Sequence, residues 1–141
     1  MKSQLALGHE DALAAIDAIR GELERLGKSA VIAVADAHGE LLAFLRMDDA
    51  PLGSIGVACG KAFTAARLRR PSGVVGARIR EKGTDIAYYG DARYVGFGGG
   101  MPVVVEGVTV GAIGVSALSD AEDEALASLG VARIVERNAE R

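Results

Sequence analysis

Aromatic side chains, cysteine and histidine are all scarce in this sequence. Aromatic residues make up 4% of the chain, tryptophan is absent, and there are one cysteine and two histidines. The single cysteine, Cys59, excludes an intramolecular disulfide framework and a zinc site built from cysteines. No apolar run approaches the roughly 20 residues of a membrane-spanning helix, and the N-terminal apolar run is shorter than a signal-peptide core of roughly 7–15 residues. We therefore expect a cytoplasmic protein that does not enter a membrane.

The apolar bulk that is present comes from Ala, Val, Leu and Ile. Of the 141 residues, 50% are hydrophobic, 25% are charged and 19 are glycines. This balance is typical of a globular protein, and the length predicts a single domain over residues 1–141 because domains usually contain about 100–200 residues. The formal net charge is −3, with acidic and basic residues interleaved. Nucleic-acid-binding proteins usually carry a clustered basic face, so the sequence argues against that class of partner.

Changes in apolar periodicity divide the chain into helices and strands. Leu13, Ile16 and Ile19 repeat at three-residue steps, which is typical of a helix with one buried face. Short apolar runs bounded by turn residues are typical of strands. Residues 83–100 show weak periodicity, and an irregular stretch of this length usually has a function or covers another element. The predicted helices cover residues 8–26, 54–69, 73–81 and 119–137, and the predicted strands cover residues 30–35, 41–45, 101–105 and 108–116.

This order of elements predicts an α+β protein with an antiparallel sheet flanked by helices. Residues 36–40 and the pair Glu106-Gly107 are suited to the two hairpin turns. The strand at 108–116 is apolar almost throughout, so we expect it to be central and covered on both faces. Ser119 and Glu122 have the spacing of a capping box and predict the start of the last helix.

Three consecutive glycines, Gly98, Gly99 and Gly100, precede Met101 and Pro102. Glycines tolerate positive φ and close approach, so this segment could offer backbone N–H groups to an anion. The spacing differs from that of a dinucleotide-binding loop, and a strand rather than a helix follows, so a nucleotide-phosphate loop is not indicated. A backbone bend into the strand at Met101 explains the glycines equally well.

Polar residues recur at three-residue steps on the predicted helix 54–69. The spacing places Lys61 and Thr64 on one face, with Arg67 nearly in line. Lys61 and Thr64 could hold a carboxylate there. The alternative is a solvated face on which Thr64 bonds its own backbone.

The remaining candidates are isolated residues. Arg46 and Asp48 follow a predicted strand and either face a cleft or form a rim ion pair of little energetic value. His9, near the start of the first helix, is a candidate metal ligand or else a surface residue, and His38 at a hairpin tip is a poorer candidate. Cys59 is expected to be a small core residue. No serine has a histidine partner that would indicate a catalytic triad.

Several motifs occur in an order that is typical of one family. Residues 36–54 read D-A-H-G-E-L-L-A-F-L-R-M-D-D-A-P-L-G-S, residues 61–65 read K-A-F-T-A, residues 99–102 read G-G-M-P, and residues 111–116 read G-A-I-G-V-S. With Gly107 between the last two motifs and Asp123 near the last helix, the chain resembles the GlcG/HbpS-like family over about residues 7–127. This family is often labelled haem-degrading and includes the C-terminal domain of PduO proteins. Where it usually has two glycines after Ser116, this sequence has Ala117 and Leu118.

The resemblance implies a profilin-like α/β/α sandwich that forms homo-oligomers, with ligand sites at or near subunit interfaces. Some members of the family bind haem or iron, so haem is a candidate cofactor, whereas others belong to catabolic operons. Haem iron normally has a His, Cys, Met or Tyr axial ligand. Among the histidines His9 is the candidate, and the tyrosines that could replace it are Tyr88, Tyr89 and Tyr94.

Three functional hypotheses follow. The first is an oligomeric protein that binds haem or another flat anionic molecule, with His9 as the metal ligand. Its predicted ligand-binding residues are Gly98, Gly99, Gly100, Met101, Arg67, Ser116 and Asp123. The second is a catabolic enzyme (a deaminase, isomerase or hydrolase) acting on a small organic carboxylate. Its predicted catalytic residues are Lys61, Thr64, Arg46 and Asp48, with Glu106 or Asp123 as alternative bases. The third is a structural or regulatory subunit whose glycine-rich strand is a packed interface.

Overall fold

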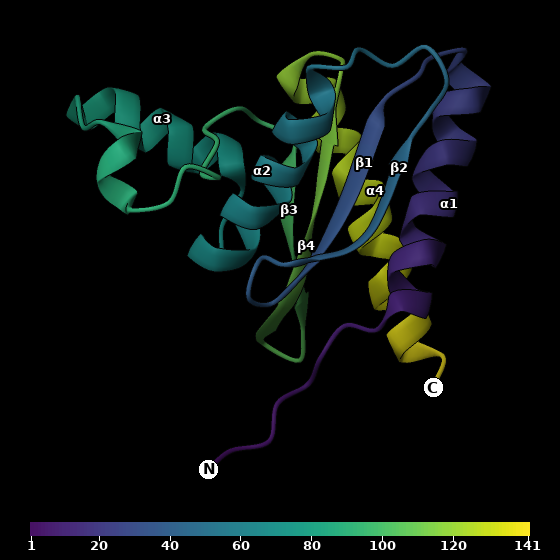
Figure 1. The fold of residues 1–141 in the computed structure, drawn as a ribbon. Coiled ribbons are helices and arrows are strands. Elements are labelled where there is room, and N and C mark those ends of the chain that lie inside the picture. The colour runs from purple at the N-terminus through teal and green to yellow at the C-terminus, as the bar shows by residue number, and fades with distance from the viewer.

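The computed structural model describes all residues, 1–141, and contains the predicted order of helices and strands (Figure 1). One short 3₁₀ helix, η1, interrupts the stretch that was predicted to be irregular. No helix combines the length and the apolar content needed to cross a bilayer. The elements are α1 (His9–Leu26), β1 (Val31–Asp36), β2 (Leu41–Arg46), α2 (Ser54–Leu68), α3 (Ser72–Lys82), η1 (Ile86–Tyr89), β3 (Gly100–Val105), β4 (Val108–Ser116) and α4 (Asp120–Ala139).

The four strands form one antiparallel sheet in the order β2-β1-β4-β3. Val31 of β1 pairs with Arg46 on one side and with Ser116 on the other, so these three residues form one row across the sheet. β4 lies between two strands, and its residues 110–116 are all buried. The prediction of a central strand covered on both faces is therefore confirmed.

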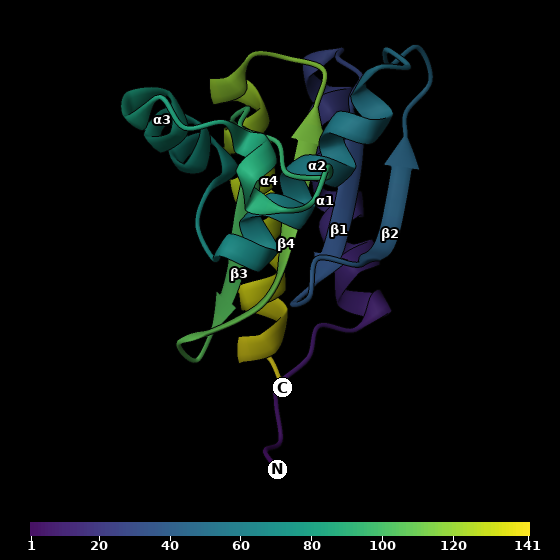
Figure 2. The same cartoon turned by 60° about the vertical axis from the view of Figure 1, so that its left-hand side comes forward.

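Helices cover both faces of the sheet, which confirms the predicted α+β sandwich. α1 and α4 pack together on one face, and α2 lies on the other (Figures 1 and 2). On the side of α1 and α4 the core is built from large side chains such as Ile19 and Leu23 of α1 and Ile113 of β4. On the side of α2 the core is built mainly from small side chains, including Ala33 of β1 and Ala62 of α2. Because small side chains separate them, α2 lies close to the sheet.

Two paired glycines let the backbone of α2 approach the sheet. Gly100 of β3 lies opposite Gly114 of β4. A Cβ atom at Gly114 would be 2.2 Å from the carbonyl oxygen of Ala58, and one at Gly100 would be 2.3 Å from that of Lys61. Such distances are far inside van der Waals contact, so only glycine fits. The close approach that glycine permits at these positions is thus made by this chain's own helix.

Residues 83–99 cover α2 and α3, as expected for an irregular stretch of this length. Val95 packs on α2, where a Cβ atom at Gly60 would be 2.4 Å from Val95 Cγ2. A Cβ atom at Gly76 of α3 would be 1.9 Å from the carbonyl oxygen of Gly96. Together α3 and η1 project from the side of the sheet (Figures 1 and 2).

Capping and an ion pair fix the last helix. Ser119 Oγ accepts a hydrogen bond from the N–H of Glu122 at 3.2 Å, which confirms the predicted cap. The Glu122 carboxylate accepts from the Ser119 hydroxyl instead of from its backbone N–H. At the other end, Arg137 and Arg141 donate to the carboxylate of Asp11 in α1. Burial raises the pKa of Asp11, but these two arginines outweigh burial and hold that pKa below its ordinary value, so an ionised Asp11 links α1 to α4.

Candidate functional site

A cavity lies at the end of the molecule where both hairpin turns meet. Because β1 and β4 are antiparallel, with Asp36 opposite Gly111, the β1–β2 turn and the β3–β4 turn lie at the same end of the sheet. The N-terminal segment and the end of α2 complete the walls. This hairpin-end cavity has a volume of about 640 Å³, within the roughly 300–1,000 Å³ of typical ligand pockets. Its lining residues are Lys2, Ser3, Gln4, Leu5, Ala37, His38, Arg69, Gly107, Val108 and Thr109.

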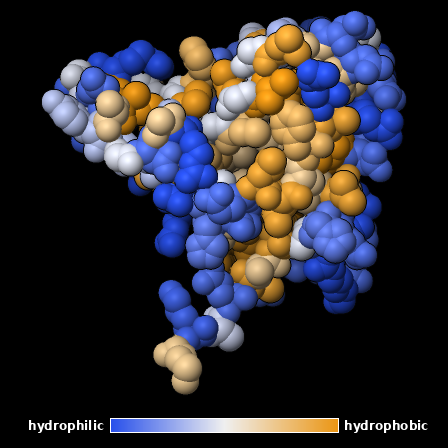
Figure 3. Space-filling view, viewed as in Figure 1, coloured by the Kyte–Doolittle hydropathy of each residue, from blue (hydrophilic) through white to orange (hydrophobic).

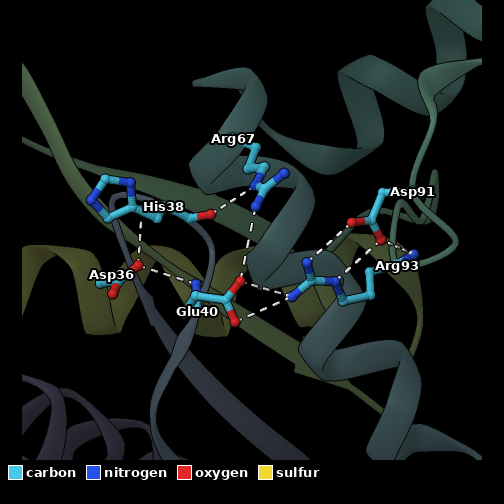
Figure 4. A network of polar contacts seen from close by, with 6 residues as sticks. All are labelled: Asp36, His38, Glu40, Arg67, Asp91 and Arg93. Carbon is cyan, nitrogen blue, oxygen red and sulfur yellow. Dashed lines mark hydrogen bonds and ion pairs between the residues drawn. The ribbon is translucent and has the colours of Figure 1, made fainter.

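The backbone of His38 is held from both sides. Its N–H donates to Asp36 Oδ1 at 2.8 Å, and Arg67 Nε donates to its carbonyl oxygen at 2.7 Å (Figure 4). The turn is tight because Gly39, at φ 90°, lies against the Phe63 ring, where a Cβ atom would be 2.8 Å from Cδ2. The exposed imidazole of His38 has no hydrogen-bond partner in the chain, so its ring nitrogens are free for a ligand.

An arginine network ties this turn to α2 and to the loop before β3 (Figure 4). Arg93 pairs with Asp91 and Glu40, both at 3.0 Å, and Arg67 lies 3.9 Å from Glu40. The guanidinium groups of Arg93 and Arg67 also lie 4.1 and 4.7 Å from the centre of the Phe63 ring. Hydrogen bonds to Asp91 and then to Glu40 raise the pKa of Arg93, and the hydrogen bond from Arg93 lowers that of Asp91. Each guanidinium is thus balanced by carboxylates. The network holds the β1–β2 turn, which carries His38 into the cavity wall, against α2.

The two cations that line the cavity itself, Arg69 and Lys2, lack such balance. Arg69 ends α2 in the left-handed conformation, at φ 56°, and has no carboxylate within 4.0 Å. Lys2 likewise makes no ion pair. A free imidazole, two unpaired cations and the apolar side chains of Leu5 and Val108 therefore line one space. This donor set suits a ligand that combines an apolar body, carboxylates and a metal.

The residues predicted around Lys61 form a second cluster, which is closed to solvent. Lys61 Nζ donates to Asp123 Oδ2 at 3.0 Å and to the carbonyl oxygen of Val115 at 2.9 Å, and the two side chains are 2% and 1% exposed. Burial raises the pKa of Asp123, opposed by Lys61 and by the backbone N–H groups of Leu118 and Ala117. The pair joins α2 to α4 across the end of β4. A substrate carboxylate could reach Lys61 only by displacing Asp123.

Ala117 holds an unusual backbone conformation beside this pair. Its φ is 142°, in the range that favours glycine. Ala117 stands where the resembled family usually has glycine, and it lies in a half-buried turn whose N–H groups, those of Ala117 and Leu118, donate to Asp123.

The glycine-rich segment lies beside the same pair, with its N–H groups largely occupied. Gly98 donates to Asp120 Oδ2 at 3.0 Å, and Gly100 donates to Ser72 Oγ at 2.8 Å. Gly99, at φ 127°, lies so close that a Cβ atom would be 2.8 Å from Lys61 Nζ. The segment therefore makes a bend into β3, which was one of its two interpretations, and Ser72 is a partner that the sequence did not indicate.

The other predicted residues are dispersed. Thr64 is buried, and its hydroxyl accepts from the N–H of Val95 at 2.9 Å. Arg46 and Asp48 are exposed at the far end of β2, Glu106 is exposed in the β3–β4 turn, and His9 is exposed at the first position of α1. The predicted residues that come together are Lys61, Asp123, Gly98, Gly99 and Gly100, with Met101 half-buried and Ser116 buried on the neighbouring strands. No group of three or more His, Cys, Asp or Glu side chains is arranged to hold a metal ion.

Comparison with known proteins gives matches over nearly the whole chain. The family model described as "Haem degrading protein HbpS-like" matches residues 7–132. Protein GlcG of Escherichia coli strain K12 is 38% identical over 117 residues, which span 82% of this chain and 85% of GlcG. A double mutant of Streptomyces reticuli HbpS has a TM-score of 0.85 at 31% identity, over 94% of this chain and 89% of that one. The PduOC:heme complex has a TM-score of 0.82 at 26% identity, over 92% of this chain and 95% of that one.

Proposed function

The chain belongs to the HbpS-like family, and from this premise we propose that it binds haem in the hairpin-end cavity. The proposal rests on one observation, that a free imidazole and two unpaired cations line the same space. In the related PduOC structure the bound molecule is haem. When bound, haem supplies an iron centre whose behaviour depends on its axial ligand and on the polarity around it.

The residues of the cavity match the parts of that molecule. The imidazole of His38 would hold the iron, and the hydrogen bonds of the His38 backbone to Asp36 and Arg67 fix the turn that carries it. Arg69 and Lys2 bind the two carboxylates, since charge-assisted hydrogen bonds to carboxylates are among the strongest that proteins make. Leu5 and Val108 contact the apolar macrocycle.

His9, the histidine that the sequence favours, remains the alternative iron ligand. It is exposed at the start of α1 and does not line the hairpin-end cavity. The three tyrosines are also outside that cavity, on η1 and in the loop that follows it. His38 is therefore preferred because it lines the cavity and His9 does not. Substitution of each histidine in turn distinguishes the two candidates.

Titration of the purified protein with hemin tests the assignment. We expect a Soret shift that saturates at one haem per chain. His38→Ala should weaken binding at least tenfold, which is about 1.4 kcal/mol, because the iron loses its ligand. Arg69→Gln should keep the Soret band and weaken binding roughly fivefold, because a solvent-exposed ion pair contributes at most about 1 kcal/mol. His9→Ala is the matched control and should titrate as the wild type does.

Two results would contradict the assignment. If His38→Ala binds hemin as the wild type does while His9→Ala fails, the site is at the start of α1. If the wild type shows no saturable Soret shift, the chain does not bind haem. Circular-dichroism melts of both variants should match the wild type, since both imidazoles are exposed.

We also propose that the protein is a homo-oligomer in which a second copy covers an apolar surface beside β2. Phe44 pairs with Ala33, whose side chain faces α2, so Phe44 lies on the same side of the sheet and is 37% exposed. Leu52 is 70% exposed, and Ile55 and Cys59 are half-buried on α2. Figure 3 shows a continuous hydrophobic area over β1 and β2 in this view. Such areas often mark interfaces between proteins.

Light scattering tests the oligomer. The wild type should have a mass of two or more times the 14.5 kDa of one chain. Phe44→Glu should shift the mass to that of the monomer, because a buried unpaired carboxylate opposes association. Val135→Glu, at an exposed position on α4, is the matched control and should leave the mass unchanged. A wild-type mass of 14.5 kDa would refute the proposal.

A further inference from the structure

Unpaired arginines are concentrated on one short stretch of the chain. Residues 69–80, from the end of α2 through most of α3, contain four arginines and no Asp or Glu. None of the four has a carboxylate within 4.0 Å, whereas arginines elsewhere, such as Arg20, Arg93 and Arg137, make ion pairs. In a chain of net charge −3 this local excess of positive charge is unusual. Positive charge that the protein does not balance itself attracts anions.

Two of these arginines converge on a cavity with a tyrosine. Arg70, Arg78 and Tyr89 line a space of about 190 Å³ whose other walls are Leu68 and Val75. This α2–α3 cavity is separate from the hairpin-end cavity. Consecutive residues serve the two sites, since Arg69 lines the first and Arg70 lines the second. The left-handed conformation of Arg69 sends the chain in a new direction between them.

Two of the side chains around the α2–α3 cavity, those of Arg70 and Tyr89, make contacts of their own with the chain. Arg70 Nε donates to the carbonyl oxygen of Leu68 at 3.2 Å, which leaves its terminal nitrogens for a ligand. The Tyr89 ring meets the Tyr94 ring edge-on at 5.6 Å, and Tyr94 in turn lies 4.9 Å from Phe63. A positioned donor loses less conformational entropy on binding than a free one.

We propose that the α2–α3 cavity binds a small oxyanion, either a carboxylate or a phosphate, between Arg70 and Arg78 with a hydrogen bond from the Tyr89 hydroxyl. The planar guanidinium group matches both anions in a bidentate manner. The volume is well below the roughly 300–1,000 Å³ of pockets for large ligands, so only a small molecule fits. The proposal does not depend on haem binding.

Calorimetric titration with inorganic phosphate and, separately, with succinate tests this site. Saturable binding of either anion at one site per chain supports it, and the tighter of the two identifies the class. Arg78→Gln should weaken that binding at least tenfold, and Tyr89→Phe several-fold. Arg80→Gln is the matched control, because Arg80 lies on the same helix but does not line the cavity, and it should bind as the wild type does.

Two outcomes would overturn the inference. One is the absence of saturable binding of both anions to the wild type. The other is an equal loss in Arg80→Gln and Arg78→Gln, which would mean that only the general positive charge of α3 attracts the anion. Hemin titration of Arg78→Gln should be unchanged, so failure here and failure of the haem assignment are distinguishable.

Discussion

Lys61→Met is expected to lower the free energy of unfolding by about 3–5 kcal/mol, the usual cost of removing one partner from a buried ion pair. Lys61 and Asp123 are 2% and 1% exposed, and their contact joins α2 to α4. Without the ammonium group, Asp123 keeps only the amides of Leu118 and Ala117. Urea denaturation followed by circular dichroism measures the loss. The double variant Lys61→Met/Asp123→Leu should recover most of it, because a buried pair can be replaced by apolar side chains.

The pH dependence of the same variant gives a second measurement. Burial already raises the pKa of Asp123 above its ordinary value, and Lys61 opposes that rise. In Lys61→Met the folded protein therefore holds the Asp123 proton more tightly than the unfolded chain does. The stability of the variant should be greatest in acid and decline as the pH rises through the raised pKa.

This measurement also separates a structural pair from a substrate clamp. If Lys61 holds a substrate carboxylate, as the enzyme hypothesis requires, Lys61→Met loses activity and keeps its stability. A loss below about 1 kcal/mol, equal at pH 5 and pH 8, would contradict the buried ion pair.

Gly114→Ala is expected to destabilise the protein by about 3 kcal/mol, at the upper end of the range for overpacking. The added Cβ atom would lie 2.2 Å from the carbonyl oxygen of Ala58 and 2.7 Å from the N–H nitrogen of Ala62. Both are backbone atoms of α2, so neither can swing aside as a flexible side chain can. The substitution must push α2 away from the sheet. Thermal and urea denaturation both measure the effect.

Gly56→Ala is the matched control because it makes the same change on α2 itself. A Cβ atom at Gly56 meets nothing within 4 Å. Alanine is a better helix former than glycine, so this variant should be more stable by about 0.5 kcal/mol. If both variants change stability in the same direction and by similar amounts, α2 does not rest on the glycines of the sheet.

The sequence predicted the fold well because its elements have clear periodicities. Every helix and strand occurs where the apolar pattern placed it, apart from η1 and shifts of one or two residues at the ends. The position of β4 in the middle of the sheet followed from its almost continuous apolar run. The resemblance to the GlcG/HbpS-like family is confirmed by the family model and by the solved structures.

The candidate sites could be predicted only in part. The sequence identifies Lys61 and Asp123 as separate candidates, but it does not show that they neutralise each other, because a contact across 62 positions is not visible in local spacing. The hairpin-end cavity is built from four separate segments: the N-terminal residues, the β1–β2 turn, the end of α2, and the β3–β4 turn with the start of β4. Because these segments are far apart in the sequence, no local pattern marks His38 as a better candidate ligand than His9.

A crystal structure of the hemin-saturated protein tests haem binding at the hairpin-end cavity most directly. The proposal predicts one haem per chain in that cavity, with the iron bound to the His38 imidazole and the carboxylates on Arg69 and Lys2. Iron bound to His9, or haem held away from the hairpin turns, would contradict it.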